Sequence, residues 1–533
     1  MKYIVNCFIV SALIMLVGCH KDLDKFPPNS FTAEEVYKTE AGYKQVLAKV
    51  YGSMALTGNS GPTGSGDVAG IDEGNSDFLR LFWEVQELSA DLALVAWDGT
   101  FDIGLQDIQI HRWGSGNPRS KGLYYRSLFI ITLCNEFIKQ SAPSRLATRG
   151  ITGAAAQRVA VMRAEARFVR AFQYWVLLDV FGNPAFVTDQ DGIGAFNPRQ
   201  IKQPELFTYI ETELKEIEGI LPAPRQNEYG RADKAAAWAL LARLYLNSEK
   251  VYGTGRKYNE ALDYANRVIT SNAYSLQPNY PWLFLADNAT NGSQNEIIWS
   301  INYDGTRTRN FGGTTFLVNG STGGNMDPAF SGLEAWAGIR AKEGLPVLFP
   351  DFTGIIDRRA LFFQGKLQND VRTQFTDGFG VTKFRNRTSS GGFGTDPDRR
   401  FSDIDFPVFR LAEMYMIYAE AVFRGANNGT TSQAVTYINL VRRRAYGGSS
   451  IGDIITADFN ENFLLNERAR EFYWEAQRRT DLLRFERYLG SNYLWPWKGG
   501  TRFGTGLNSW QNILPLPDTE IASNPNIRQN PNY

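Results

Sequence analysis

Apolar side chains recur at helical spacing along much of the chain. Phe168, Phe172, Trp175 and Leu178 follow one another at intervals of four, three and three residues, with arginine and glutamine on the other faces. This period predicts an amphipathic helix over about residues 162–181. Similar patterns predict further helices over residues 206–220, 235–248, 258–270, 411–424, 432–444, 463–475 and 478–488.

The predicted helices are expected to come in pairs. Residues 235–270 contain two of them across a short glycine-containing turn, and helix–turn–helix units of about 34 residues are typical of tetratricopeptide (TPR) repeats. A single helical hairpin cannot bury its apolar face alone, so several should stack into one scaffold. We therefore expect a mainly α-helical body of stacked TPR-like hairpins at about residues 163–220, 235–270, 411–444 and 463–488.

Glycine-rich stretches separate the helical segments. Residues 58–76 and residues 305–324 each contain six glycines. Loops of this length in a compact protein are usually either functional or disordered. Strand-like runs occur at residues 296–301 and 406–410. We expect the scaffold to carry a loop-rich face with short strands.

The first residues predict an export signal. The apolar run from Ile4 to Val17 is shorter than the roughly 20 residues that a membrane-spanning helix needs. It leads into Leu-Val-Gly-Cys at residues 16–19, which resembles a bacterial lipobox, although an ordinary secretory signal with a chance cysteine is the alternative. We expect a signal peptide at residues 1–18, an acylated Cys19 with a tether over residues 19–30, and a single body at residues 31–533. The acyl chains would be the membrane anchor.

Composition and charge narrow the chemistry. The 533 residues carry 56 Lys and Arg against 56 Asp and Glu, so no cationic surplus points to nucleic acid. Two histidines cannot build a three-histidine zinc site, and the acidic segment 396–405 misses the EF-hand pattern. No phosphate-binding or dinucleotide motif is present. We expect no cofactor, no metal site and no enzymatic activity, although paired carboxylates for glycoside hydrolysis are always available among so many acids.

The remaining reactive side chains have structural interpretations. Cys134 lies in an apolar stretch and is expected to be a buried small hydrophobe, and His111 a structural histidine. The mixed-charge runs 466–471 and 478–484 are expected to form intramolecular ion pairs.

Three aromatic residues stand at loop edges outside the helical patterns. Trp97 follows a hydrophobic run, Tyr303 opens the glycine-rich stretch, and Trp336 lies beyond it. A flat ring at a loop edge suits the apolar C–H face of a sugar, while polar neighbours would bond its hydroxyls. For each ring taken alone, simple packing is the alternative.

Five blocks of sequence resemble the SusD/RagB family of Bacteroidetes surface lipoproteins. They are Arg163 to Ala171 with Phe181 to Pro184, Gly230 to Ala236 with Leu241 to Tyr245, Phe409 to Ala421, Glu467 to Phe472 with Arg478 to Leu482, and the ending Leu514 to Pro517 with Asn524 to Tyr533. The resemblance implies a TPR-like scaffold under a loop-rich ligand face at about residues 58–112 and 303–400. It also implies capture of oligosaccharide or polysaccharide at the cell exterior and delivery to a SusC-like TonB-dependent outer-membrane transporter.

The resemblance also implies site residues. Trp97, Tyr303 and Trp336 match the family's aromatic cradle, with Asp72 and Arg80 as polar partners, and Asp98 stands where glycan binders can present an amide. Two other readings remain open at this point. A peptide-capturing subunit of the same kind of transporter would use main-chain pairing and pockets, with the three aromatic rings buried, and a surface glycoside hydrolase would need two carboxylates about 5–10 Å apart.

Overall fold

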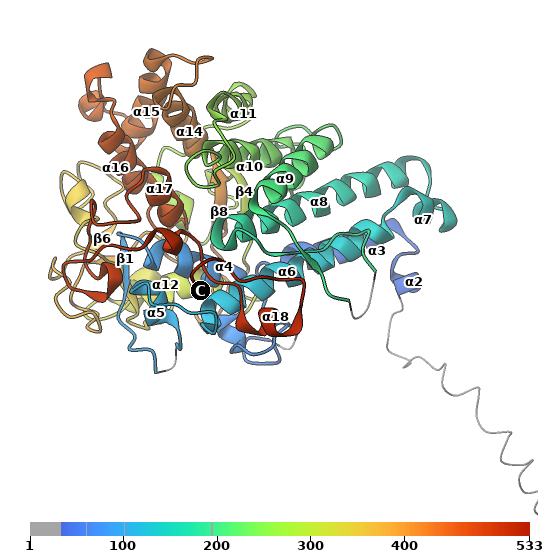
Figure 1. The fold of residues 1–533 in the computed structure, drawn as a ribbon. Helices are drawn as coiled ribbons and strands as arrows, with labels where there is room; N and C mark the ends of the chain where they lie inside the picture. The colour runs from blue at the N-terminus through green and yellow to red at the C-terminus, as the bar shows by residue number, and fades with distance from the viewer. Residues whose placement is uncertain (1–32, 60, 101, 193–195) are drawn as a thin grey trace, which may run out of the picture.

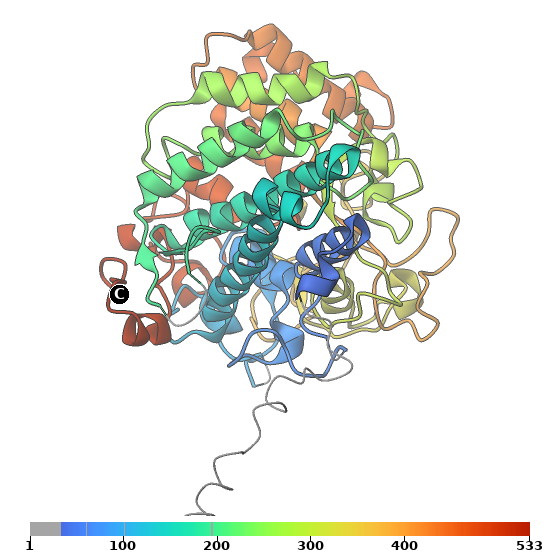
Figure 2. The same ribbon diagram turned by 90° about the vertical axis from the view of Figure 1, so that its right-hand side faces the viewer.

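Helices stacked side by side form most of the body, and irregular loops cover one end of the stack (Figures 1 and 2). The computed structural model describes residues 33–59, 61–100, 102–192 and 196–533. The predicted signal peptide, the lipidation site at Cys19 and the tether lie outside the described residues. The α-helices are α2 (Ala33–Val36), α3 (Glu40–Gly52), α4 (Phe78–Trp83), α5 (Leu105–Gln109), α6 (Pro118–Gln140), α7 (Pro143–Thr148), α8 (Gly153–Phe181), α9 (Gln203–Glu218), α10 (Lys234–Leu246), α11 (Tyr258–Thr270), α12 (Gly313–Ser321), α13 (Pro328–Ser331), α14 (Leu411–Phe423), α15 (Thr431–Ala445), α16 (Glu461–Phe472), α17 (Arg478–Arg484) and α18 (Asp518–Ser523).

Shorter elements complete the chain. The strands are β1 (Ala93–Val95), β2 (Ala185–Phe186), β3 (Arg199–Gln200), β4 (Ile297–Ile301), β5 (Ile339–Ala341), β6 (Phe362–Phe363), β7 (Gly380–Val381) and β8 (Phe406–Arg410). A π-helical turn, η2 (Glu84–Leu88), follows α4. Short 3₁₀ turns are η1 (Glu73–Asn75), η3 (Tyr280–Phe284), η4 (Ser293–Asn295), η5 (Pro346–Leu348), η6 (Ser450–Gly452), η7 (Thr456–Asp458), η8 (Lys498–Gly500) and η9 (Ser509–Asn512).

The helix ends follow local chemistry. Asp233 precedes α10, and its Oδ1 accepts hydrogen bonds from the main-chain nitrogens of Ala235 at 2.8 Å and Ala236 at 3.1 Å. A side-chain acceptor here satisfies amides that have no partner within the helix. The C-terminal end of α8 also follows local chemistry. This helix stops at Gly182, whose φ of 71° costs glycine little because glycine has no Cβ.

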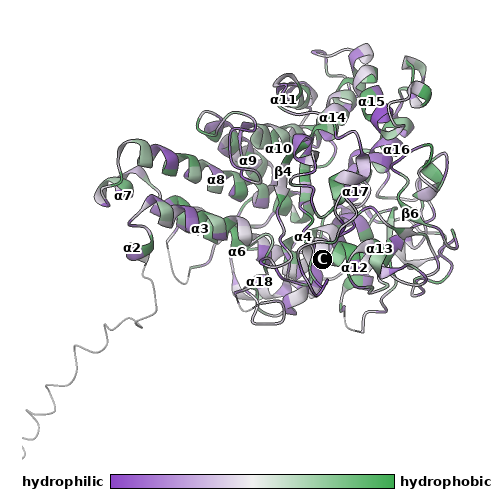
Figure 3. Ribbon diagram, turned by 180° about the vertical axis from the view of Figure 1, so that it is seen from behind, coloured by the Kyte–Doolittle hydropathy of each residue, from purple (hydrophilic) through white to green (hydrophobic). Residues whose placement is uncertain are grey.

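The helices stack in chain order, although residues 271–410 are inserted between α11 and α14. Helix α6 packs on α8, α8 on α9, α9 on α10, α10 on α11, α11 on α14 and α14 on α15. The ribbons of α8 and α9 alternate hydrophilic and hydrophobic residues, as amphipathic helices do (Figure 3). The predicted mainly helical fold is confirmed, whereas the pattern analysis did not predict α3 and α6. No helix within the described ranges is both long and apolar enough to cross a bilayer.

The strands form four separate antiparallel pairs among the described residues, namely β1 with β5, β2 with β3, β4 with β8, and β6 with β7. The two strand-like runs recognised in the sequence pair with each other, because they are β4 and β8. The pair β1–β5 joins the first loop region to the middle one. It is this pair that positions the candidate site.

The charged runs near the C-terminal end form ion pairs inside the protein, as predicted. Arg478 pairs with Asp91 at 2.7 Å, and Arg484 pairs with Glu420 at 2.6 Å. Both arginines are buried. These pairs join segments far apart in the sequence, whereas the spacing alone suggested partners within one helix.

Cys134 and His111 are buried, as expected for structural residues. Burial raises the pKa of the Cys134 thiol to about 12, which keeps the sulfur protonated and unreactive. The pKa of His111 falls to about 3, because the charged imidazole would be desolvated. Its Nε2 lies 2.7 Å from the Ser89 carbonyl oxygen, and its Nδ1 accepts a hydrogen bond from the Gly499 amide.

Candidate functional site

The strand pair β1–β5 brings Trp97 and Trp336 to one place. Val95 lies opposite Ile339, and the Ala96 amide donates a hydrogen bond to the Gly338 carbonyl at 2.6 Å. Trp97 and Trp336 lie just beyond the paired residues on their respective segments. The indole Nε1 of Trp97 donates to the main-chain oxygen of Trp336 at 3.0 Å. Both rings remain partly exposed.

The end of α12 holds the Trp336 segment in place. The amides of Trp336, Ala337 and Gly338 donate to the carbonyls of Asn319 at 2.9 Å, Thr322 at 2.8 Å and Gly320 at 2.8 Å. Carbonyls in the last turn of a helix lack partners within the helix. The segment that carries Trp336 satisfies some of them, and its backbone is fixed as a result.

Gly338 allows the Trp97 ring to lie against the main chain. A methyl group added at Gly338 would stand 2.3 Å from the nearest indole carbon of Trp97. That separation is far below van der Waals contact, so the close packing of ring on backbone requires glycine at this position.

A third ring, Phe311, belongs to the same face. Its centroid lies 6.2 Å from that of Trp336, at an interplanar angle of 60°. Phe401 is buried beside it with a centroid separation of 5.5 Å, and Phe316 lies 6.1 Å from Trp97. Phe311 is partly exposed. The sequence analysis missed it, although its position before Gly312 and Gly313 in the glycine-rich stretch was a usable signal. We call Trp97, Trp336 and Phe311 the aromatic face.

Arg80 supports the aromatic face from beneath. Arg80 is 4% exposed, and its guanidinium lies 4.5 Å from the centre of the Phe316 ring. It forms ion pairs with Glu84 at 2.9 Å and with Asp102 at 2.6 Å. The expectation that Arg80 contacts the ligand directly is therefore corrected, because its charge is already neutralised inside the protein.

Tyr303 is a second correction. It is 6% exposed, and its ring packs against Gly313, where an added Cβ would lie 2.3 Å from the ring edge. Its hydroxyl is buried with no hydrogen-bond partner among the described residues. Burial raises the pKa of Tyr303 well above its usual value. Tyr303 belongs to the core under the loops and presents no ring to a ligand.

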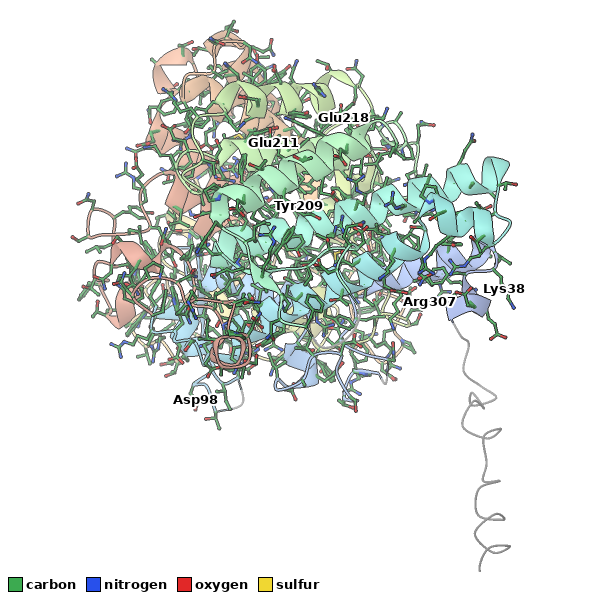
Figure 4. All side chains as sticks on the ribbon, turned by 45° about the vertical axis from the view of Figure 1, so that its right-hand side comes forward. Lys38, Asp98, Tyr209, Glu211, Glu218 and Arg307 are labelled. Carbon is green, nitrogen blue, oxygen red and sulfur yellow. The ribbon has the colours of Figure 1, made fainter. Side chains whose placement is uncertain are left out.

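The two predicted aspartates are exposed. Asp72 lies beside Gly74, and Gly74 packs against the Cβ of Phe311, which places Asp72 near the aromatic face. Asp98 extends away from the body (Figure 4). Its carboxylate accepts a hydrogen bond from the Thr100 amide at 2.9 Å, and this interaction lowers the pKa of Asp98. Asp72 therefore stands near the aromatic face as a solvated acceptor, whereas the Asp98 side chain points into solvent.

Further charged groups surround the rings. Glu334 accepts a hydrogen bond from Nε1 of Trp336 at 3.4 Å and lies 3.8 Å from the Arg400 guanidinium. Arg400 in turn stands 5.7 Å from the centre of the Phe311 ring. Flat apolar rings beside hydrogen-bonding groups can hold a pyranose ring by its C–H face and its hydroxyls. Within the described residues, no cluster of His, Cys, Asp or Glu could hold a metal ion.

Comparisons with known proteins identify relatives along the whole chain. Residues 357–533 match the SusD family. The chain is 36% identical over 584 aligned residues to the starch-binding protein SusD of Bacteroides thetaiotaomicron, an alignment that covers 100% of this chain and 99% of the relative. It is 26% identical to SusD-like protein P2 of Formosa agariphila, with 100% of both chains covered.

Solved structures share the fold. Surface glycan-binding protein A from Bacteroides thetaiotaomicron, in complex with laminarihexaose, superposes with a TM-score of 0.69 at 20% identity, covering 92% of this chain and 99% of that one. A SusD homologue from the same organism gives a TM-score of 0.71 at 19% identity, covering 94% and 99%. The full-length identity to the starch-binding relative and the shared helical fold establish that this chain belongs to the SusD family.

Proposed function

We propose that this protein captures oligosaccharide or polysaccharide on its aromatic face and breaks no bond in it. The observation that carries the proposal is the pairing of Trp97 with Trp336, two partly exposed indoles held together by β1, β5 and the end of α12. A rigid pair of rings loses little conformational entropy on binding, so its stacking on a sugar is available as affinity.

The membership of the SusD family supports the rest of the proposal. The protein would be anchored in the outer membrane by an acylated Cys19, facing the cell exterior, and would deliver its glycan to a SusC-like TonB-dependent transporter. Because the relative with 36% identity is named as a starch-binding protein, maltooligosaccharides are the first ligands to test.

The structure does not favour a peptide site over a glycan site. A peptide site was expected to bury all three predicted rings, but only Tyr303 is buried, whereas Trp97 and Trp336 remain partly exposed. The acids around the rings do not favour hydrolysis either. Glu334 is already engaged by Arg400 and by the Trp336 indole, and Asp98 is bound to a main-chain amide, with a lowered pKa rather than the raised pKa of a general acid.

The test uses the soluble chain that begins after Cys19. We expect isothermal titration to detect binding of at least one neutral polysaccharide or oligosaccharide in a panel that contains maltoheptaose, laminarihexaose and amylopectin. We also expect the purified protein to release no reducing sugar from any ligand that it binds. Binding of unstructured peptides in place of every glycan, or steady release of reducing sugar, would contradict the proposal.

A further inference from the structure

A cavity opens among loops that do not contribute to the aromatic face. Its volume is about 770 Å³. Four loop segments, 279–285, 327–330, 353–361 and 385–391, provide most of its lining. No residue of the aromatic face lines it, so any ligand held here would occupy a separate site.

The charged side chains that line the cavity are mostly positive. It includes Arg358, Arg385 and Arg387, against the single acidic residue Asp327. The Asp327 carboxylate is already used, because its Oδ1 accepts a hydrogen bond from the Ala329 amide at 2.9 Å and caps α13. Within the described part of the chain, none of the three arginines forms an ion pair with a carboxylate. This differs from core arginines such as Arg359, Arg410 and Arg484, which are paired with acids.

Arg385 is the clearest case of an unsatisfied charge. Its guanidinium donates no hydrogen bond to any described residue, and its Nε is buried. The group lies 4.8 Å from the centre of the Phe330 ring, which holds it at the cavity. Burial and the neighbouring Arg387 lower the pKa of Arg385, since both disfavour its charged form. An anion beside Arg385 would stabilise its charged form and so offset both the burial and the repulsion from Arg387.

Arg387 is held rigidly beside it. Its Nη1 donates to the Ala329 carbonyl at 2.8 Å, and its guanidinium lies 4.0 Å from the centre of the Phe393 ring. The main chain fixes the relation between the two arginines and the floor of the cavity, because the amide of Arg385 donates to Phe284 and that of Ala286 donates to the Arg387 carbonyl. Two neighbouring guanidinium groups, one of which donates no hydrogen bond to a described residue, are suited to one carboxylate.

Two aromatic rings complete the lining. Phe330 is 47% exposed, and Trp282 is partly exposed. The indole N–H of Trp282 donates to no described residue and remains available. A ligand that combines an anion with a flat apolar face would use both kinds of group. The side chain of an aspartate or glutamate offers the anion without such a face.

We propose that this cavity is a second glycan subsite that takes an acidic sugar, with the carboxylate of a hexuronate on Arg385 and Arg387 and its pyranose ring against Trp282 and Phe330. The protein would then hold a charged residue of a branched or mixed glycan independently of the neutral stretch on the aromatic face. The proposal does not depend on the neutral-sugar site, because the two sites share no residue.

The test compares a galacturonic acid trisaccharide with its methyl ester, in which the rings are the same and the charge is absent. We expect titration calorimetry on the soluble chain to give at least tenfold tighter binding of the acid, and Arg385→Gln to remove that preference. Arg385→Lys keeps the charge but loses the planar fork, so it should bind with intermediate affinity. Arg307→Gln is the control, since Arg307 is 85% exposed on another loop (Figure 4).

Two further measurements keep the outcomes separate. Arg385→Gln should bind maltoheptaose like the parent, and Trp336→Ala should bind the acidic trisaccharide like the parent, which separates failure of this subsite from failure of the neutral site. Arg387 is the other proposed carboxylate partner and is partly exposed, so Arg387→Gln serves if Arg385→Gln does not fold. Equal binding of acid and ester, an unchanged preference in folded Arg385→Gln or its substitute, or displacement of the trisaccharide by an equal concentration of a glutamate-rich peptide would overturn the proposal.

Discussion

The indole of Trp97 donates its hydrogen bond to the main-chain oxygen of Trp336 at 3.0 Å, across 239 positions of sequence. The hydrogen bond uses the polar edge of the Trp97 ring and the backbone of Trp336. The flat face of neither indole takes part in it. The bond therefore fixes the Trp97 ring relative to the Trp336 backbone. The contribution of the two rings to binding should depend on this geometry as well as on their chemistry.

The first prediction concerns Trp336. Trp336→Ala removes a partly exposed ring and leaves the main-chain acceptor of Trp97 in place, so binding of the neutral ligand should weaken about tenfold, or about 1.4 kcal/mol, with little change in the melting temperature. Calorimetric titration measures the first and differential scanning fluorimetry the second. Trp238→Ala on α10 is the matched control, because that indole is bonded to Glu218 in the helical scaffold. Equal binding by the Trp336 variant and the parent would place the site elsewhere.

The second prediction concerns Gly338. Gly338→Ala puts a methyl group 2.3 Å from the Trp97 ring, so the ring must move off the backbone and lose its bond to Trp336. We expect neutral-glycan affinity to fall at least as much as in Trp336→Ala. Gly344→Ala is a suitable control, since the nearest atom to its added Cβ is 4.0 Å away. Parent-like binding by Gly338→Ala would mean that the position of the Trp97 ring does not matter.

The third prediction tests the corrected role of Tyr303. Its hydroxyl is buried without a partner, so Tyr303→Phe removes a desolvated polar group and should leave the free energy of unfolding unchanged or raise it by about 1 kcal/mol. Glycan affinity should not change. Urea unfolding and titration measure the two quantities. A clear loss of affinity in a stable Tyr303→Phe protein would restore the hydroxyl to the site.

The fourth prediction concerns Arg80. Arg80→Met leaves Glu84 and Asp102 with less positive charge nearby, and removing one member of a buried ion pair costs about 3–5 kcal/mol. We therefore expect a lowered melting temperature along with weaker binding. Arg307→Met on the exposed loop is the control and should change neither. A fully stable Arg80→Met protein with abolished binding would instead indicate direct contact with the ligand.

The fifth prediction concerns acid stability. Arg484 and Arg424 hold the pKa of Glu420 at about 2, although its burial alone would raise it. A carboxylate whose pKa is lowered by folding stabilises the protein above its unfolded value of about 4.5 and loses this contribution as the pH falls toward 2. The loss is on the order of 3 kcal/mol for this group.

The matched variants isolate that contribution. Glu420→Gln should be less stable than the parent at pH 7, and the difference should shrink between about pH 4.5 and pH 2, as followed by urea unfolding. Glu205→Gln is the control, because Glu205 is 62% exposed and its pairing with Arg199 is worth little. A difference between Glu420→Gln and the parent that stayed constant over this range would show that the carboxylate is not held in its charged form.

Much of the scaffold could be predicted from the sequence, because helical periodicity is a local property. The spacing of Phe168, Phe172 and Trp175 predicts α8 without knowledge of any partner. Helices α3 and α6 were not predicted. Helix α6 depends on contacts with other parts of the chain. Its apolar stretch around Cys134 is readable, but its start depends on the Asn117 cap and on burial against α8.

The candidate site was predicted only in part. Trp97 and Trp336 were recognised by their place at loop edges and by family resemblance, and the structure brings them together. Tyr303 and Arg80 were expected to face a ligand, yet both are buried. Phe311 was missed because its place before two glycines indicates a loop but does not show whether the ring is exposed or packed.

The sequence alone determined the helical periods, the family resemblance and the absence of recognisable catalytic motifs. Each of these depends on the order of residues that are close together in the chain. Only the tertiary structure decided which aromatic rings are exposed, because exposure depends on what packs from distant segments. The pairing of β1 with β5 put Trp97 beside Trp336, and the packing of Tyr303 on Gly313 removed that ring from the surface. The sequence shows that these residues are aromatic. Which groups surround each ring depends on contacts that form only when the chain folds.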